Sequence, residues 1–357
     1  MITSNKTLKN SLTTLCVIGT FLVCSTAQAG WTTWNNGSGD GLWSNASNWT
    51  GSVPDASSDA AIINNLSTTG AALALTGSND SFDYLRVGHA HTGHEGPGTL
   101  NIAGANLITT AASNTREGIG YGSGGIGILN LSSGSLTLGN QWISIGGGGG
   151  SQGTVNQTGG LLSVGGINPN SLSLGSSNST ALYNFTAGTL ETREAFNITT
   201  GGSGTSVFQV NGYDASSSIQ IGGTTDDYNG AWLQGAGTTL SLSIDGGTAQ
   251  GTTLINIGAG AGGTHTGEAT FAAGTILDLD FKSGATTGTW WTVLTAEGGI
   301  TDGGFTFDDT NWDYRIVDGA GTSQSLEVTA LVIPEPSSIA LVLIVGAALL
   351  ITRRRKA

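Results

Sequence analysis

The sequence predicts an all-β protein whose body is a right-handed parallel β-helix, a solenoid of short strands wound into stacked coils. Three observations support this prediction. Glycine provides 60 of the 357 residues and charged residues only 10%, a composition that favours tight turns over long helices. Apolar residues recur at regular spacing, which a disordered chain lacks. A unit of about 27 residues repeats through the middle of the chain.

Residues 1–29 have the three parts of a secretory signal peptide. A basic start, a mostly apolar stretch and a small-x-small cleavage site follow one another: Lys6 and Lys9, then Leu12 to Val23, then Ala27-Gln28-Ala29. We therefore expect a signal helix in residues 1–29, cleavage between Ala29 and Gly30, and export of the mature protein.

Cysteine and charge restrict what the mature body can do. Both cysteines, Cys16 and Cys24, lie in the segment that we expect to be removed, so we expect no disulfide and no cysteine metal site. Residues 30–333 contain 23 acidic and five basic residues, a net charge of −18. Such a body does not bind nucleic acid by neutralising phosphates, and it repels acidic polysaccharides unless divalent cations bridge the two.

Tryptophan distinguishes residues 30–81. Four tryptophans fall among Gly, Ser and Asn: Trp31, Trp34, Trp43 and Trp49. The run 41–49, Gly-Leu-Trp-Ser-Asn-Ala-Ser-Asn-Trp, resembles the opening of many secreted bacterial β-solenoid proteins. Such rings can stack on sugars, or they can cover the open end of a solenoid core. We favour an N-terminal cap.

Residues 82–225 contain the repeat. An amide residue recurs between flanking positions that are mostly apolar: Asn101, Asn130, Asn156, Asn184 and Gln209. Six residues after each Asn comes a leucine: Leu107, Leu136, Leu162 and Leu190. The fifth unit has Ala215 there instead. A third strand ends in an apolar-Gly pair in most units: Val87-Gly88, Ile119-Gly120, Ile145-Gly146, Leu174-Gly175 and Ile221-Gly222.

This pattern predicts three short strands per coil, with one coil per repeat. Because side chains alternate along a strand, the flanking apolar residues should point inward and the Asn amides outward, where they could form a ladder. The leucines should stack in one interior column. A β-propeller or a sandwich is the competing architecture. It is less favoured because the repeat is short and has no tryptophan signature in each unit.

Residues 226–333 lose this register but keep short alternating runs. We expect some of the early runs to be further coils. The later runs, with Trp290, Trp291 and Trp312, predict a C-terminal cap or a small antiparallel unit.

Residues 334–357 predict a targeting segment that also anchors the protein in a membrane. Pro334-Glu335-Pro336 precedes an uncharged run from Ser337 to Thr352, and a basic cluster follows: Arg353, Arg354, Arg355 and Lys356. The prolines interrupt a helix just before the apolar run. As a transmembrane helix that run spans roughly 24 Å, and the cationic end can snorkel and is expected in the cytoplasm.

These residues resemble the PEP-CTERM sorting signal of Gram-negative bacteria, with the Pro-Glu-Pro element, the short span and the basic end in the right order. The resemblance is confined to residues 334–357. It implies an exosortase-type membrane processing enzyme as a partner and an association with exopolysaccharide and the cell surface. It assigns sorting to Pro334, Glu335 and Pro336 and no catalytic role to any residue. An ordinary tail anchor is the alternative.

Candidate catalytic and metal-binding residues are few. His89, His91 and His94 with Glu95 form the densest cluster of possible zinc or copper ligands. However, they lie in a Gly-rich corner, so we favour a variable polar loop and predict no metal site and no cofactor.

Carboxylates could in principle catalyse polysaccharide cleavage if several of them converged. The candidates are Asp226-Asp227, Asp308-Asp309 with Asp313, and the run Glu191-Thr192-Arg193-Glu194. The sequence shows neither the pattern of a Ser/His/Asp catalytic triad nor a phosphate-binding loop, and we predict that the protein is not an enzyme.

The sequence therefore predicts an exported structural or adhesive protein of the cell surface or exopolysaccharide, first tethered to the inner membrane. A carbohydrate-binding surface protein is the alternative, and a polysaccharide lyase or hydrolase is a third possibility.

Overall fold

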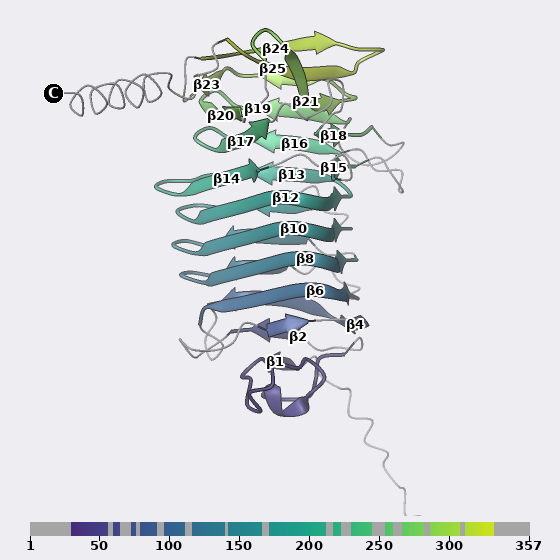
Figure 1. Ribbon diagram of the computed structural model, residues 1–357. Coiled ribbons are helices and arrows are strands. Elements are labelled where there is room, and N and C mark those ends of the chain that lie inside the picture. Colours follow the sequence, from purple (N-terminus) through teal and green to yellow (C-terminus); the bar gives the residue numbers. More distant parts are fainter. Residues whose placement is uncertain are drawn as a thin grey trace, which may run out of the picture.

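Strands that are distant in the sequence lie directly above one another and pair in parallel (Figure 1). The computed structural model describes residues 30–55, 60–64, 73–75, 79–90, 96–110, 116–139, 142–165, 171–211, 217–222, 230–244, 254–259, 266–281, 286–307 and 311–331. Within these residues, every pairing between named strands is parallel except those made by the last strand, β25. The predicted all-β parallel solenoid is confirmed.

One side of the solenoid, which we call wall 1, is a single sheet with one strand from each coil. In spatial order its strands are β1 (Trp31–Thr33), β2 (Ala60–Ile63), β5 (Tyr84–His89), β7 (Arg116–Tyr121), β9 (Trp142–Gly147), β11 (Leu172–Leu174), β13 (Ala195–Ile198), β16 (Ala231–Gln234), β19 (Glu268–Phe271) and β22 (Ile300–Asp302).

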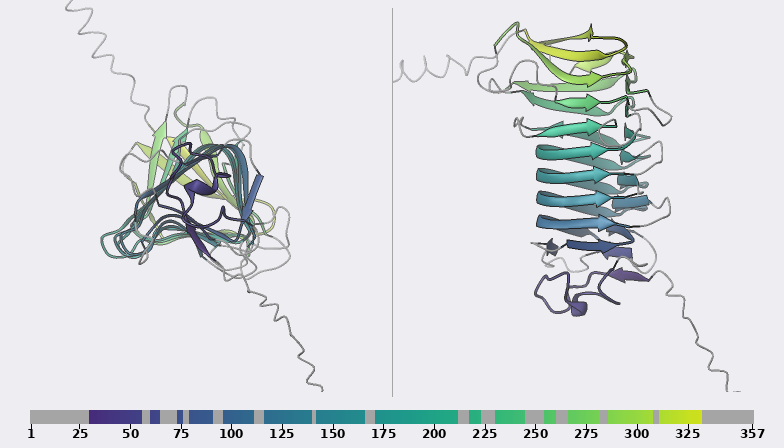
Figure 2. Two further views of the ribbon diagram at one scale, coloured as in Figure 1. Left: turned by 90° about the horizontal axis from the view of Figure 1, so that it is seen from below. Right: turned by 90° about the vertical axis from the view of Figure 1, so that its right-hand side faces the viewer.

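A second sheet bends to form the other two sides, walls 2 and 3, so that the coils have a three-sided outline along the axis (Figure 2, left). In four coils one long strand crosses both walls: β6 (Gly98–Thr109), β8 (Ile126–Leu138), β10 (Gln152–Val164) and β12 (Thr180–Thr192). The pairing register shifts where these strands bend. A β-bulge thus bends the strand at the corner without ending it. For this reason the first two strands predicted in each of these units form a single continuous strand.

In the other coils the two walls have separate strands. Wall 2 contains β3 (Leu73–Leu75), β14 (Thr205–Val210), β17 (Thr239–Ile244), β20 (Thr275–Phe281) and β23 (Phe305–Phe307). Wall 3 contains β4 (Asn79–Phe82), β15 (Ser218–Ile221), β18 (Ile255–Ile257) and β21 (Trp290–Ala296).

The predicted leucine column lies inside wall 3. Leu107, Leu136, Leu162 and Leu190 are paired in register from coil to coil, and each is 0% exposed. The column continues through Ile219, Ile255 and Leu294. The prediction that these leucines stack in one interior column is confirmed.

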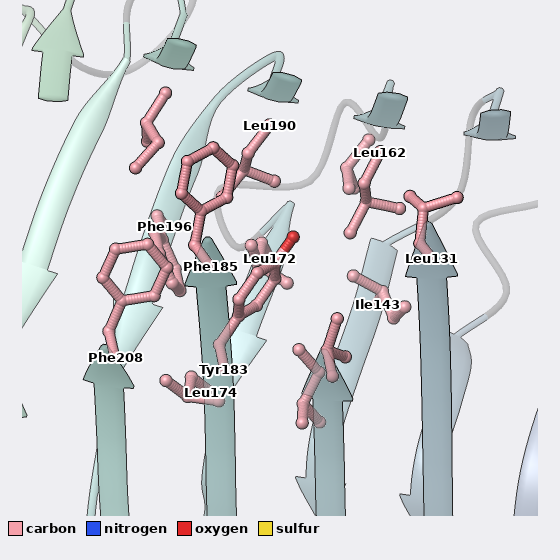
Figure 3. Close-up of a cluster of buried hydrophobic side chains, with 14 of the residues drawn as sticks. Leu131, Ile143, Leu162, Leu172, Leu174, Tyr183, Phe185, Leu190, Phe196 and Phe208 are labelled. Carbon is pink, nitrogen blue, oxygen red and sulfur yellow. The ribbon is translucent and has the colours of Figure 1, made fainter. Parts of the chain in front are cut away.

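The apolar residues that flank each Asn also point inward, from wall 2. One column contains Leu100, Leu129, Val155, Tyr183 and Phe208, and all five are fully buried. In the middle coils the rings of this column pack on one another and on wall 1, as Figure 3 shows for Tyr183, Phe208 and Phe196. The core is therefore continuous along the axis.

The fifth repeat differs from the prediction. Its wall 3 position in the leucine column is Ile219, ten residues after Gln209 rather than six. Ala215 lies outside the described residues. Ile221 belongs to wall 3, and the residue that continues the column of Ile145 and Leu174 in wall 1 is Ile198. The apolar-Gly pair at Ile221-Gly222 was therefore assigned to the wrong wall, because the coil is longer at that corner.

Parallel pairing also extends beyond residues 82–225 on both sides, from Trp31 in β1 to Phe307 in β23. Successive members of the leucine column are spaced by one sequence repeat as far as Ile219, whereas Ile219, Ile255 and Leu294 are farther apart along the chain. These longer coils explain why the repeat is lost from the sequence after residue 225 while the solenoid continues.

An aromatic plug covers the N-terminal end. Trp34, Trp43 and Trp49 are 1%, 3% and 4% exposed, and Trp43 packs on Phe82 of the first coil at a ring distance of 5.3 Å. The loop around them contains the short 3-10 helix η1 (Ala46–Asn48). The structure therefore supports the predicted N-terminal cap.

An antiparallel unit covers the C-terminal end. Strand β25 (Gln324–Ala330) lies between β21 and β24 (Trp312–Asp318) and runs antiparallel to both. Beneath it, the ring of Trp312 stacks on Phe281 at 3.8 Å and Trp291 packs against the same ring. The sequence predicts a C-terminal cap or a small antiparallel unit in this region, and the antiparallel pairing is present.

Candidate functional site

The predicted sorting and processing residues lie almost entirely outside the described residues. This applies to Pro334, Glu335 and Pro336, to the basic cluster from Arg353 to Lys356, and to Ala27 and Ala29. Gly30 is the first described residue and is exposed. Among the described residues there is no helix long and apolar enough to cross a membrane.

His89 lies at the end of β5 in a cluster of aromatic rings. It is 1% exposed, and its ring lies 5.6 Å from Tyr121 and 5.7 Å from Trp31. Asn64 holds its backbone, because the Asn64 amide accepts from His89 N at 2.8 Å and donates to His89 O at 3.1 Å. The ring is thus fixed by packing and by its backbone.

Arg86 lies against one of the two ring nitrogens of this imidazole. Its Nη1 lies 3.2 Å from His89 Nε2, an arrangement in which the guanidinium, a donor only, donates to a neutral ring. The guanidinium also lies 4.5 Å from the centre of the Tyr121 ring. His91 and His94 lie outside the described residues. In the part of the chain that the structure describes, no three His, Cys, Asp or Glu side chains group in a way that could hold a metal ion.

Glu117 is a buried carboxyl that the sequence analysis did not single out. It is 0% exposed, and one of its oxygens accepts from the backbone N–H of Leu85 on the neighbouring coil. Burial raises the pKa of Glu117 well above its ordinary value, an effect that the Leu85 N–H and the positive charge of Arg86 only partly offset. Strand alternation could have revealed it, because Glu117 is two residues before inward-facing Ile119.

The candidate carboxylates do not converge within the described residues. Glu191 lies on the outer side of wall 3 and is half-buried, whereas Glu194 is 4% exposed at the corner before β13. Asp313 is exposed on β24 at the C-terminal cap. The pairs Asp226-Asp227 and Asp308-Asp309 lie outside the described residues. Among the candidates that are described, the structure therefore brings no two together as an acid and a base.

Three of the predicted outward-facing Asn residues, Asn101, Asn130 and Asn156, form a hydrogen-bonded ladder on wall 2. Asn130 Nδ2 donates to Asn101 Oδ1 at 2.6 Å, and Asn156 Nδ2 donates to Asn130 Oδ1 at 2.8 Å. Asn184 continues the register and accepts from Asn211 Nδ2 at 2.7 Å. All are at least partly exposed.

Comparison with known proteins gives no further assignment, since no family model, no curated protein and no solved structure matches this chain.

Proposed function

We propose that this protein is an exported, non-catalytic scaffold of the cell surface or exopolysaccharide, sorted through its C-terminal Pro-Glu-Pro signal. The observation that best supports a structural role is the continuous core. The leucine column of wall 3 and the buried column of wall 2, from Leu100 to Phe208, run through coil after coil, and a plug or a cap covers each end. In a rod of this kind each coil contacts mainly its neighbours. Such an architecture suits a structural role rather than a catalytic one.

Two alternatives are less favoured, namely sugar binding through the Trp-rich N-terminal end and polysaccharide cleavage. Sugar binding by the Trp-rich N-terminal end requires exposed rings, but Trp34, Trp43 and Trp49 are buried. A polysaccharide lyase or hydrolase requires converging carboxylates, but of the predicted candidates that are described, Glu191 and Glu194 belong to a middle coil and Asp313 lies on β24 at the C-terminal end. A reducing-sugar assay on the purified protein tests the second alternative directly.

The sorting part of the proposal includes the signal peptide, the transmembrane tail and the exosortase-type partner. Pro334 and Pro336 would hold the chain extended just outside the apolar run, with the carboxylate of Glu335 between them at the membrane surface. Such a rigid, charged element can be read by a processing enzyme, whereas the generic apolar run offers no comparable feature.

Replacement of Pro334, Glu335 and Pro336 by alanine tests this proposal. The variant keeps the apolar run and the basic cluster, so we expect it to be exported and held in the membrane but neither processed nor passed to the surface. The matched control is the adjacent pair Ser337→Ala and Ser338→Ala, which should behave like the wild type. Cell fractionation and intact mass spectrometry report the compartment and both chain ends. If the triple variant reaches the same compartment with the same C-terminus as the wild type, the tail is only an anchor.

A further inference from the structure

Wall 2 presents a regular outer surface over five successive coils. We call this surface the amide face and define it by three columns. The middle column contains the amides Asn101, Asn130, Asn156, Asn184 and Gln209. The residues two positions before and after each amide point to the same side. One flanking column is in register and contains Thr99, Ile128, Thr154, Leu182 and Val207. The other lies at the bulge, where the pairing register shifts, and contains Ala103, Ser132, Thr158, Thr186 and Asn211.

The ladder orients the amides and leaves hydrogen-bonding capacity on the surface. An Asn side chain has two N–H donors and an oxygen with two lone pairs. Asn130 uses one donor toward Asn101 and accepts one bond from Asn156. One donor and one lone pair of this partly exposed side chain are therefore not used by the ladder. A ligand that reaches this surface meets amides whose orientation is already fixed, which reduces the entropic cost of binding.

None of the residues in the three columns is charged, although the body of the protein has a net charge of −18, with 23 acidic and five basic residues. The amide column meets an acid only in a later coil, where Ser241 Oγ donates to Asp278 Oδ2 at 2.7 Å. An uncharged partner can approach this face without desolvating a charge, whereas an acidic polymer is repelled by the surrounding protein.

The size and chemistry of the face favour a polymer over a second copy of the chain. Five coils at about 4.8 Å and strands of five residues give a surface of roughly 20 by 15 Å. This is about 300 Å², well below the ~800 Å² per partner of a stable protein interface. A chain of sugar hydroxyls lying along the axis would meet an amide at every coil, and the apolar groups of Ile128, Leu182 and Val207 can contact the C–H surfaces of sugar rings.

We propose that the amide face binds a neutral, linear polysaccharide aligned with the solenoid axis. This inference names a partner for the scaffold, and it rests on the proposed function only in requiring that the body is exposed outside the membrane.

Affinity electrophoresis of the purified full-length protein, kept in mild detergent, tests the inference. Gels contain either hydroxyethylcellulose, a neutral linear glucan, or alginate, an acidic polymer. We expect the neutral glucan alone to retard the wild type. The double variant Asn130→Ala and Asn156→Ala should bind about tenfold more weakly, since two hydrogen-bonding side chains are lost. The matched control, Thr137→Ala with Ser163→Ala, changes outward-facing residues of the same two strands, β8 and β10, on wall 3 and should bind like the wild type.

A second variant keeps the test valid if loss of the ladder unfolds the protein. Thr158→Glu adds a charge to an exposed position of the amide face and should also weaken retardation several-fold, with an unchanged unfolding midpoint in urea. The inference is overturned if hydroxyethylcellulose does not retard the wild type, or if both face variants bind as tightly as the control. It is also overturned if light scattering shows a dimer that the Asn variants dissociate, because the face would then be a self-association surface. None of these outcomes alters the fractionation result, which depends on the tail.

Discussion

The hydroxyl of Tyr183 donates a hydrogen bond to Oε1 of Gln157, 2.6 Å away, inside the solenoid where both side chains are 0% exposed. The Gln157 amide completes the arrangement by donating to the carbonyl of Thr189 at 2.8 Å. Gln157 is the one polar residue at an otherwise apolar position of the repeat, and the partner that satisfies it comes from the next coil. Since a wrong pairing of these coils would leave two buried polar groups without partners, the pair helps to fix their register.

This pair gives the first prediction. Tyr183→Phe leaves a buried amide oxygen without its donor, and Gln157→Leu leaves a buried hydroxyl without its acceptor. Each should lower the free energy of unfolding by about 1–3 kcal/mol. In the double variant both polar groups of the pair are gone, so its loss should be smaller than the sum of the two single losses. Urea unfolding of all four proteins measures the coupling. Simple additivity would show that the bond contributes nothing specific.

The leucine column gives the second prediction. Leu136 is 0% exposed between Leu107 and Leu162, so Leu136→Asp buries a charge without a partner and should cost about 3 kcal/mol or more. Asn130→Ser, on the outer side of the same strand, should cost less than about 1 kcal/mol. The comparison is made through the urea midpoints of the two variants, and equal shifts would contradict the inward and outward assignment.

Much of this architecture could be predicted from local sequence because a strand alternates with period two. Once Asn130 is placed outside, Leu129 and Leu131 must point inward, and a fixed offset of six places the leucines of each coil above one another. The regular coils at residues 98–192 satisfy these rules, and there the predicted registers are confirmed.

Contacts across coils of unequal length could not be predicted in this way. The His89 ring packs against Trp31 and Tyr121, which belong to other coils and are distant along the chain. No spacing rule brings these residues together, because the lengths of the intervening corners vary. The same variation in corner length explains why the prediction assigned Ile221 to wall 1, although it lies in wall 3. The wall 1 position belongs to Ile198, which the spacing rule did not identify.

Glycine at the corners of wall 1 gives the third prediction. Gly120 and Gly124 both have positive φ, 63° and 80°. A Cβ on Gly120 would lie 2.0 Å from the carbonyl oxygen of Gln152 on the next coil, whereas a Cβ on Gly124 would meet nothing within 4 Å. Both alanine variants incur the cost of a left-handed backbone, about 1 kcal/mol, but only Gly120→Ala also pushes two coils apart. We expect Gly120→Ala to lower the thermal midpoint clearly more than Gly124→Ala. Similar midpoints would contradict the close approach of the coils at this corner.

Glu117 gives the fourth prediction, which concerns pH. Burial raises its pKa in the folded protein well above the ordinary value of 4.5, so the folded state holds this proton more tightly than the unfolded chain does. Its contribution to stability is therefore fully present below about pH 4.5 and is lost as the pH rises above that value, because the unfolded chain releases the proton first.

Glu117→Gln keeps an oxygen for the Leu85 N–H but cannot ionise. We expect the variant and the wild type to have similar free energies of unfolding at pH 4, and the variant to be the more stable of the two at pH 8. Glu191→Gln, which removes a half-buried glutamate from the outer side of wall 3, controls for net charge. If urea unfolding shows the same pH dependence for Glu117→Gln and the wild type, the carboxyl is not held in its neutral form inside the core.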